Sequence, residues 1–362
     1  MTGRLRRAVA RLRWDLLAIV IVAFAVRLGY RLALGEAAFL DHGYTFYRDI
    51  AESFLRGQGL CFDGGVDCAV RVPVYPVLVS FFVQWDVVYP GLPITQAAIS
   101  ASRCLIAYGI GRTLFGPRAG LVAAGLTAIN PYSIVHSTAM QDTSLFNMLM
   151  ALAIYLLLQS REPQARTGLS LAAGAALAVA SLTTVRLVVF LPMAVLWAAL
   201  PSRPAAPWRR RQAALVSIPI VLLLGAWVGR NWTMVGAPVL TTEAGESLWL
   251  ANHPATAEFL PERSVDELSE VANERLPDDR ERLLDSLDSE VATDRLLARW
   301  AIEYMWANPG QTLTNMGSKI AAAFSGQLSP ARGGWVQLGY AAFIVPLHAL
   351  ALIGWWRTRG RP

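Results

Sequence analysis

Two aspartates lie beside long apolar stretches of the chain and carry the side chains best suited to proton transfer. Asp41 follows the first apolar stretch by a few residues, and Asp142 directly precedes another. A carboxylate can remove the proton of a hydroxyl group as that group attacks an electrophilic carbon. Each aspartate also sits where a helix is expected to begin, so capping of a helix N-terminus is the alternative role for both.

Three arginines lie where a cation at the edge of a membrane could meet a phosphate group. Arg71 and Arg230 flank apolar stretches, and Arg186 interrupts an apolar run from Ala172 to Leu200. A charge inside such a run is unfavourable in lipid, so its side chain is expected to face a polar cavity or an anion. Guanidinium groups stabilise phosphates through paired, charged hydrogen bonds. The alternative is that these side chains snorkel to the lipid headgroups.

The elements that must position these residues are membrane-spanning helices. Hydrophobic residues make up 54% of the chain and charged residues only 16%, whereas about a quarter of the residues of a soluble domain are charged. Several apolar stretches approach the length of about 20 residues that crosses a bilayer. The stretches that we expect to span are 14–34, 94–115, 119–136, 143–159, 168–184, 186–200, 213–229 and 336–356.

The basic residues in the connections between the other apolar stretches indicate whether the stretch 72–89 crosses the membrane. If it lies on the membrane or re-enters, both termini and all short basic connections share one compartment, which the positive-inside rule makes the cytoplasm. If it spans, those basic connections fall outside. Its prolines and those just beyond it, Pro73, Pro76, Pro90 and Pro93, also favour a broken surface segment. The sequence therefore predicts eight spanning helices.

The predicted fold is an all-α polytopic membrane bundle with surface helices and a small helical external segment. Its parts are 1–34 (cytoplasmic basic tail and first transmembrane helix), 35–92 (external loop with amphipathic surface helices), 93–230 (transmembrane core), 231–335 (external acidic helical segment) and 336–362 (last transmembrane helix and basic tail). In the external loop, Tyr44, Tyr47, Ala51, Phe54 and Leu55 recur at the spacing of one helix face. That pattern predicts an amphipathic helix lying in the interface.

Charge and motifs exclude several classes of function. The net charge of +6 is concentrated in short connections between apolar stretches, so membrane lipids explain it and nucleic acid is not an expected partner. The sequence contains no P-loop, Rossmann, zinc-protease or serine-hydrolase motif. A lipid or solute transporter or flippase is one alternative, although we find no inverted repeat typical of such folds. A catalytically degenerate scaffold is the other.

Motifs along most of the chain resemble one superfamily of membrane enzymes. The first region carries Asp41-His-Gly-Tyr44, then Gly57-Gln-Gly59-Leu60, then Arg71-Val-Pro73-Val-Tyr75-Pro76. Asn130-Pro131 with Asp142, Arg230-Asn231, and Ala301 to Pro309 with Lys319 follow in order. Their order and placement resemble the GT-C glycosyltransferases, especially bacterial members of the dolichyl-phosphate-mannose protein mannosyltransferase family (glycosyltransferase family 39-like). A chain of 362 residues is short for this superfamily, whose members often carry extra helices and a soluble C-terminal domain.

The resemblance implies a glycosyltransferase that moves a hexosyl or pentosyl unit, with inversion, from a polyprenyl-phosphate-linked donor to a lipid, glycan or protein acceptor. It implies a multi-pass protein of the inner (plasma) membrane and cell envelope, with its active site on the external, periplasmic side. The implied residues are Asp41 and Asp142 for catalysis, Arg71, Tyr75, Arg186, Arg230 and Lys319 for the donor, and Asp41, His42 and Asp142 for a divalent cation, Mg²⁺ or Mn²⁺. For His42 the alternative is an exposed loop histidine, and for Lys319 an ordinary surface lysine.

The cysteines give one further expectation about the external loop. Cys61 and Cys68 are seven residues apart and bracket Gly64-Gly65. An oxidising compartment and a flexible turn predict a disulfide between them, with two free thiols as the alternative. Cys104 falls inside a predicted helix and is expected to remain free.

Overall fold

The structure is a computed structural model that describes residues 3–41, 43–62, 65–161, 167–200, 208–259, 263, 265–328, 331 and 333–359. At residues 3–13, 41, 208, 265 and 266 it describes the backbone alone. Two compact units divide the chain, Met1–Thr241 (unit 1) and Thr242–Pro362 (unit 2). Within the described residues there are helices and one isolated bridge, between Phe62 and Val66, but no strand.

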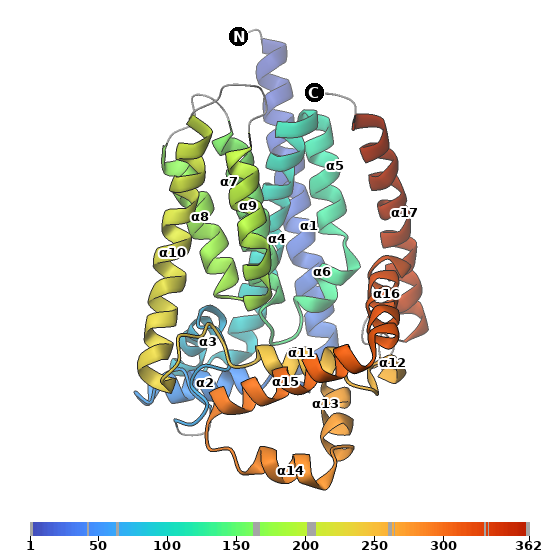
Figure 1. The fold of residues 1–362 in the computed structure, drawn as a ribbon. Helices are drawn as coiled ribbons and strands as arrows, with labels where there is room; N and C mark the ends of the chain where they lie inside the picture. Colours follow the sequence, from blue (N-terminus) through green and yellow to red (C-terminus); the bar gives the residue numbers. More distant parts are fainter. Residues whose placement is uncertain are drawn as a thin grey trace. The chain divides into compact units, whose positions relative to one another are not determined.

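Unit 1 consists of long helices side by side, with the short helices α2 and α3 at one end of them (Figure 1). Its elements are α1 (Gly3–Asp41), α2 (Phe46–Leu55), α3 (Val74–Gln84), α4 (Val88–Phe115), α5 (Pro117–Ala128), α6 (Pro131–His136), α7 (Thr143–Ser160), α8 (Thr167–Ser181), η1 (Val185–Phe190), α9 (Leu191–Ala199) and α10 (Trp208–Val235). Each stretch of this unit that is predicted to span is helical over most of its length.

Four described helical segments are each long and apolar enough to cross a membrane: 14–40, 143–160, 209–235 and 334–358. The segments Thr167–Ser181 and Val185–Ala199 are apolar but shorter. An all-helical chain with several such segments confirms the predicted fold class of a polytopic membrane protein. The number of eight crossings stays a prediction, because the other segments do not reach that length and hydropathy by themselves.

The stretch 72–89 forms no spanning helix. Its helix α3 has 11 residues, which gives a length of about 16 Å, whereas the hydrocarbon core is about 30 Å thick. α4 begins at Val88, before the predicted boundary at residue 93, and has a non-helical residue, Tyr89, in its first turn. The short helix and the irregular start of α4 agree with a segment that does not cross.

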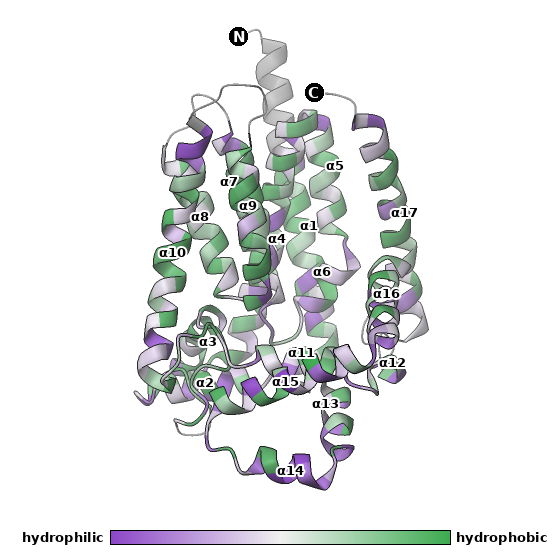
Figure 2. Cartoon of the chain, in the orientation of Figure 1, coloured by the Kyte–Doolittle hydropathy of each residue, from purple (hydrophilic) through white to green (hydrophobic). Residues whose placement is uncertain are grey.

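One end of the long helices of unit 1 carries a group of arginines. The turn between α4 and α5 lies with the end of α7 and the start of α10 at one end of the long helices, and α2 and α3 lie at the opposite end (Figure 1). The first group of helix ends carries Arg112, Arg118, Arg161 and Arg210, and purple tips mark them in Figure 2. The opposite end carries arginines as well, among them Arg48 and Arg56, so the orientation in the membrane stays a prediction.

The chain between α1 and α2 differs from the sequence-based expectation. α1 continues to Asp41 instead of ending near Leu34, with a break at Gly35, whose φ of 76° favours glycine. The helix therefore turns away at the break and carries Asp41 at its end, where the sequence predicted a loop from residue 35 onwards.

The buried face of α2 also differs from the predicted one. Tyr47 and Ala51 are buried as expected, and Ile50 joins them. Phe54 and Leu55 are exposed, because the packing side of α2 is set by its contact with α3 rather than by apolar spacing alone. An amphipathic surface helix is present, with its contact face rotated from the predicted one.

Small residues bring the long helices of unit 1 close together. Gly174 of α8 faces α10, where an added Cβ atom would lie 2.1 Å from the carbonyl oxygen of Val216. Ala173, Ala176 and Ala180 of α8 are buried nearby in the same core. Close approach through small residues is the usual packing device of membrane helices, so this part of unit 1 forms a rigid support.

The regular elements among the described residues of unit 2 are all helices. Its elements are α11 (Ala244–Asn252), α12 (Thr256–Phe259), α13 (Val265–Glu274), α14 (Asp278–Asp285), α15 (Glu290–Ala307), α16 (Pro309–Ser325) and α17 (Gly334–Thr358). Its core contains Trp249, Phe259, Leu268 and Trp300. α14 is mostly hydrophilic and α17 mostly hydrophobic (Figure 2), and α17 is long and apolar enough to cross a membrane.

Candidate functional site

The backbone around Asp41 is bonded to the backbone just before Asp142. The Phe39 carbonyl oxygen accepts from the Met140 N–H at 3.4 Å, and the Tyr44 N–H donates to the Met140 carbonyl oxygen at 2.9 Å. Gly43 lies so close that an added Cβ atom would stand 2.7 Å from the Met140 nitrogen. Two segments about 100 residues apart in sequence are therefore brought side by side at one end of unit 1.

Asp142 precedes α7 but does not cap it. Its carboxylate makes no capping hydrogen bond to the helix. Instead, the Thr184 hydroxyl donates to Asp142 Oδ2 at 2.6 Å, from the turn that follows α8. The capping alternative is thus wrong for this residue, because the carboxylate turns toward a neighbouring element.

Two arginines interact electrostatically with the Asp142 carboxylate. Burial raises the pKa of the Asp142 carboxyl, while the Thr184 hydroxyl and the positive charges of Arg186 and Arg71 lower it. The guanidinium groups of Arg71 and Arg186 therefore lie within electrostatic reach of one carboxylate, although they come from separate parts of unit 1. A carboxylate flanked by two cations forms a site that can hold a hydroxyl group and an anionic group together.

The positions of the two arginines differ. Arg71 precedes α3, and its guanidinium carbon lies 4.4 Å from the centre of the Phe46 ring of α2. Arg186 is exposed within the 3₁₀-helix η1, a tighter helix that often occurs as a short connector. The apolar run that Arg186 interrupts is thus broken at that residue, and the charge lies at a helix end rather than inside a span.

Tyr75 of α3 lies in the wall of this site. Its side chain is buried, its ring packs edge-on against Tyr47 at 4.7 Å between centroids, and its hydroxyl donates to Gln96 Oε1. It also interacts electrostatically with Asp142. Tyr75 is therefore close to the carboxylate through α3, as the motif Arg71-Val-Pro73-Val-Tyr75 requires if both residues serve one site.

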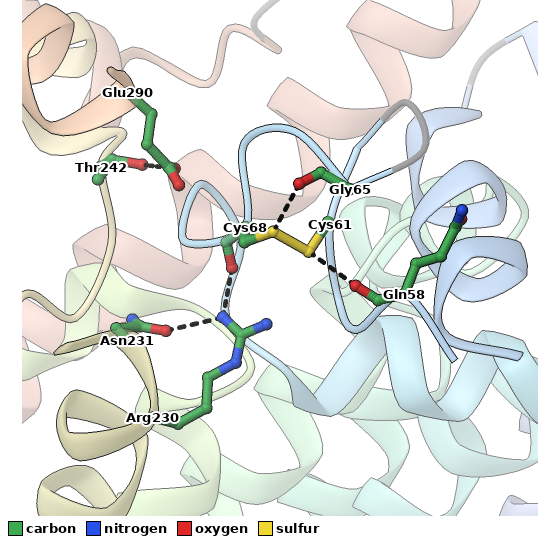
Figure 3. Close-up of a disulfide and its surroundings, with 8 residues drawn as sticks. All are labelled: Gln58, Cys61, Gly65, Cys68, Arg230, Asn231, Thr242 and Glu290. Atoms are coloured by element: carbon green, nitrogen blue, oxygen red, sulfur yellow. Dashed lines mark hydrogen bonds between the residues drawn. A yellow bond between two sulfur atoms is a disulfide. The ribbon is translucent and has the colours of Figure 1, made fainter. Parts of the chain in front are cut away.

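Arg230 holds the disulfide loop. Its guanidinium donates to the Cys68 carbonyl oxygen and, at 2.9 Å, to Asn231 Oδ1 (Figure 3). Cys61 and Cys68 are joined, which confirms the predicted disulfide, and Cys104 is buried and free, as predicted. Arg230 thus has an evident structural contact in the external loop, which the sequence did not reveal.

Lys319 lies on α16 of unit 2. Its ammonium group donates to the Ala251 carbonyl oxygen at the end of α11, and burial lowers the pKa of Lys319. Lys319 therefore ties two helices of unit 2 together, and the alternative of an ordinary surface lysine does not describe it. Its assignment to the donor stays a prediction.

The metal assignment rests largely on residues whose side chains lie outside the description. α1 ends at Asp41, but its side chain is not among the described ones, and His42 lies outside the described residues altogether. Among the residues that are described, no three His, Cys, Asp or Glu side chains gather in a way that could hold a metal ion. The described neighbours of Asp142 include two guanidinium groups, which suit an anion. A Mg²⁺ or Mn²⁺ site stays a prediction.

Sequence reasoning missed three buried polar residues near the site. Arg27 and Arg31 of α1 and Gln96 of α4 are at most 1% exposed. Arg27 donates to Ser100 Oγ at 2.8 Å and to the Ala128 carbonyl oxygen at 2.9 Å. A charged residue within an apolar spanning stretch was the available signal; Gln96 carried none.

Unit 2 has a cavity of about 380 Å³ of its own. Trp249, Trp300, Arg275, Arg280 and Glu303 are among the residues that line it. Its charged groups are paired within the unit: Arg275 lies 3.1 Å from Glu258, and Arg280 lies 3.9 Å from Glu303. This cavity contains none of the residues assigned to catalysis from the sequence.

The fold and the charged end of unit 1 define the class as an all-α membrane protein with a carboxylate–arginine site. Residues 72–228 match the family model of dolichyl-phosphate-mannose-protein mannosyltransferase. The match confirms the predicted resemblance over this stretch, which contains Tyr75, Asp142 and Arg186. No curated protein and no solved structure matches the chain.

Proposed function

We propose that the protein transfers a sugar, with inversion at the anomeric carbon, from a polyprenyl-phosphate-linked donor to an acceptor hydroxyl at the external face of the membrane. The single observation that carries this proposal is the grouping of Asp142 with Arg71 and Arg186 at one end of unit 1. Residues 72–228 match a family that transfers mannose from a dolichyl-phosphate carrier. That match supports a donor of the lipid-phosphate-linked class, and the sugar and the acceptor are left open.

In the proposed reaction, Asp41 acts as the general base. Its carboxylate takes the acceptor proton as the hydroxyl oxygen bonds to the anomeric carbon and the bond to the lipid phosphate breaks. Asp142 orients the acceptor hydroxyl or holds a divalent cation. The backbone bonds between Phe39, Tyr44 and Met140 support this pairing, since they keep the chain at Asp41 next to the chain at Asp142.

The departing lipid phosphate gains negative charge and needs cations to stabilise it. Arg71 and Arg186 are the proposed cations. Both interact electrostatically with the Asp142 carboxylate, and the phosphate would leave next to that carboxylate. Tyr75 would line the donor path next to them. Arg230 and Lys319 each bond a backbone carbonyl oxygen, and any contact of theirs with the donor would be additional to that role. A bound Mg²⁺ or Mn²⁺ would add charge stabilisation of the same kind.

Consumption of donor by the purified protein tests the proposal. The protein in detergent or nanodiscs is incubated with a panel of polyprenyl-phosphate sugars, and the release of polyprenyl phosphate is followed. The expected result is consumption of at least one donor by the wild type and consumption at least about a hundredfold slower by Asp142→Asn of equal thermal stability. A transporter or flippase would leave every donor chemically intact, and a degenerate scaffold would behave alike in both variants.

The external placement of the site has its own test. We propose that the end of unit 1 with α2 and α3 is periplasmic and the end with the basic helix tips is cytoplasmic, because basic residues favour the cytoplasmic side. In a Cys104→Ala background, a membrane-impermeant maleimide is expected to label Arg56→Cys in intact cells and Arg210→Cys only after permeabilisation. Labelling of Arg210→Cys from outside would contradict this orientation.

A further inference from the structure

The segment that leads into Asp142 is an irregular stretch of buried backbone. Between α6 and α7, residues 137–141 are each at most 9% exposed and form no helix. Buried carbonyl groups that are not bonded within a helix need donors from elsewhere, because an unpaired one destabilises the fold. The donors to this segment therefore decide where the chain enters α7 and where Asp142 points.

Two buried side chains supply donors to this segment. Gln96 Nε2 donates to the Ala139 carbonyl oxygen at 2.7 Å and to that of Ser137 at 3.4 Å. A guanidinium nitrogen of Arg31 donates to the Thr138 carbonyl oxygen between them. The next carbonyl, that of Met140, accepts from the backbone of Tyr44. Each carbonyl from residue 137 to residue 140 thus has a donor from outside the segment.

Gln96 is itself held in place. It lies on α4, is 1% exposed, and its Oε1 accepts from the Tyr75 hydroxyl. Tyr75 in turn interacts electrostatically with Asp142. One amide side chain therefore connects α3, which carries Tyr75, to the backbone just before Asp142. Arg31 acts similarly from α1, where it also donates to the carbonyl oxygen of Gly35 at the break in that helix.

We propose that Gln96 is a positioning residue of the active site, supported by Arg31. It sets the location of the Asp142 carboxylate by binding the carbonyl oxygens of Ser137 and Ala139, and it fixes Tyr75 beside that carboxylate. The inference rests on the proposed function for its catalytic consequence. The physical reason is that an apolar side chain at position 96 would leave two buried carbonyl groups and one buried hydroxyl without their partner.

Amide hydrogen exchange tests whether Gln96 holds residues 137–141 in place, and it does so without an activity measurement. Gln96→Met keeps a similar side-chain length and removes both the donors and the acceptor. Peptides covering residues 137–142 are expected to exchange at least about tenfold faster than in the wild type, with peptides of α8 unchanged, since loss of a buried bond raises local opening. The matched control is Gln159→Met, whose amide donates to Thr113 Oγ1 at the end with the basic helix tips. Unchanged exchange of residues 137–142 in Gln96→Met would overturn the proposal.

A double-mutant cycle tests the catalytic consequence. Gln96→Met is expected to lower donor turnover about tenfold in the wild type and less than about twofold in Asp142→Asn, because the effect passes through that carboxylate. Equal losses in both backgrounds would show a general structural role and overturn the positioning role. If Gln96→Met does not fold, Gln96→Asn, whose amide is one methylene too short to reach both partners, is measured in the same way. A wild type that consumes no donor would refute the proposed function, while the exchange experiment would still decide the role of Gln96.

Discussion

The charged residues of unit 1 and those around the cavity of unit 2 are arranged differently. In unit 2, Arg275 is paired with Glu258 and Arg280 with Glu303, each cation matched by a carboxylate. In unit 1, the single carboxylate of Asp142 lies within reach of two cations, Arg71 and Arg186. Matched pairs on an exposed surface contribute little to stability and leave no net charge for a ligand. Two guanidinium groups near one half-buried carboxylate are a grouping that can bind an anionic group.

The comparison teaches that the presence of a cavity and of charged side chains does not by itself mark a site. The cavity of unit 2 is lined by two tryptophans that belong to the hydrophobic core of the unit. Its arginines already have partners. The unit 1 residues, by contrast, come from three elements far apart in sequence and meet at Asp142.

The largest effect is expected at the carboxylates. Asp41→Asn and Asp142→Asn should each lower turnover by about 10²–10⁴-fold with the fold retained. An amide at position 41 cannot accept the acceptor's proton, and an amide at position 142 lacks the charge that orients the hydroxyl or holds a cation. N-capping is not the alternative at position 41, because α1 ends at Asp41 and the N-cap of α2 is Thr45; a merely structural role there predicts a mild effect instead. The matched control is Asp279→Asn on the exposed α14, which should leave turnover unchanged. Initial rates of donor consumption measure turnover, and thermal unfolding curves show whether each variant is folded. Near-normal sugar transfer by Asp41→Asn would contradict the role of Asp41 as the base.

A smaller effect is expected at the arginines, and it compares the two regions directly. Arg186→Ala should raise the Kd for a polyprenyl-phosphate sugar by about 10–100-fold, the range of one or two charged hydrogen bonds. Arg186→Lys should fall between, since it keeps the charge and loses the planar fork. Arg280→Ala in unit 2 should change the Kd by less than about twofold. Binding of a labelled donor lipid measures all three, and equal losses at Arg186 and Arg280 would end the distinction between the regions.

The disulfide should affect stability more than chemistry. Cys61→Ala with Cys68→Ala is expected to lower the free energy of unfolding by about 2–3 kcal/mol, because the unfolded chain gains the conformational freedom that the cross-link removes. Intact mass with and without reductant should differ by two hydrogen atoms. Thermal unfolding of the wild type should become reductant-sensitive and that of the double variant should not. Cys104→Ala serves as the control, since Cys104 is free; a reductant-insensitive wild type would contradict the prediction.

The smallest effect concerns pH and unit 2. Burial, and then the nearby charge of Arg275, lower the pKa of His253. The folded state therefore resists protonation, and the stability that neutral His253 contributes is present above the ordinary pKa and lost as the pH falls through the lower folded value. Tryptophan fluorescence during thermal unfolding should show a lower midpoint at about pH 5.5 than at about pH 7.5. His253→Gln should reduce this difference; an unchanged difference would assign it to other groups.

Several features followed from the sequence by itself. Long apolar stretches separated by basic connections determine a helical membrane protein, because the bilayer requires both helices of sufficient length and a charge bias in their connections. Two cysteines seven residues apart around a Gly-Gly turn can approach without help from the rest of the fold, and they are bonded. The weak span 72–89 could also be recognised from its prolines, and α3 is short.

The tertiary structure alone decided which distant groups meet. Asp142 accepts a hydrogen bond from Thr184 and lies within electrostatic reach of two arginines from other elements. Arg230 binds the Cys68 carbonyl oxygen, although its placement in sequence resembled that of Arg71. In the sequence nothing distinguishes Gln96 from other polar residues of a helix. In the structure its amide donates to the carbonyl oxygens of Ser137 and Ala139. Spacing in sequence determines which face of one helix a residue occupies. The partner of that face depends on how helices pack, which local sequence does not specify.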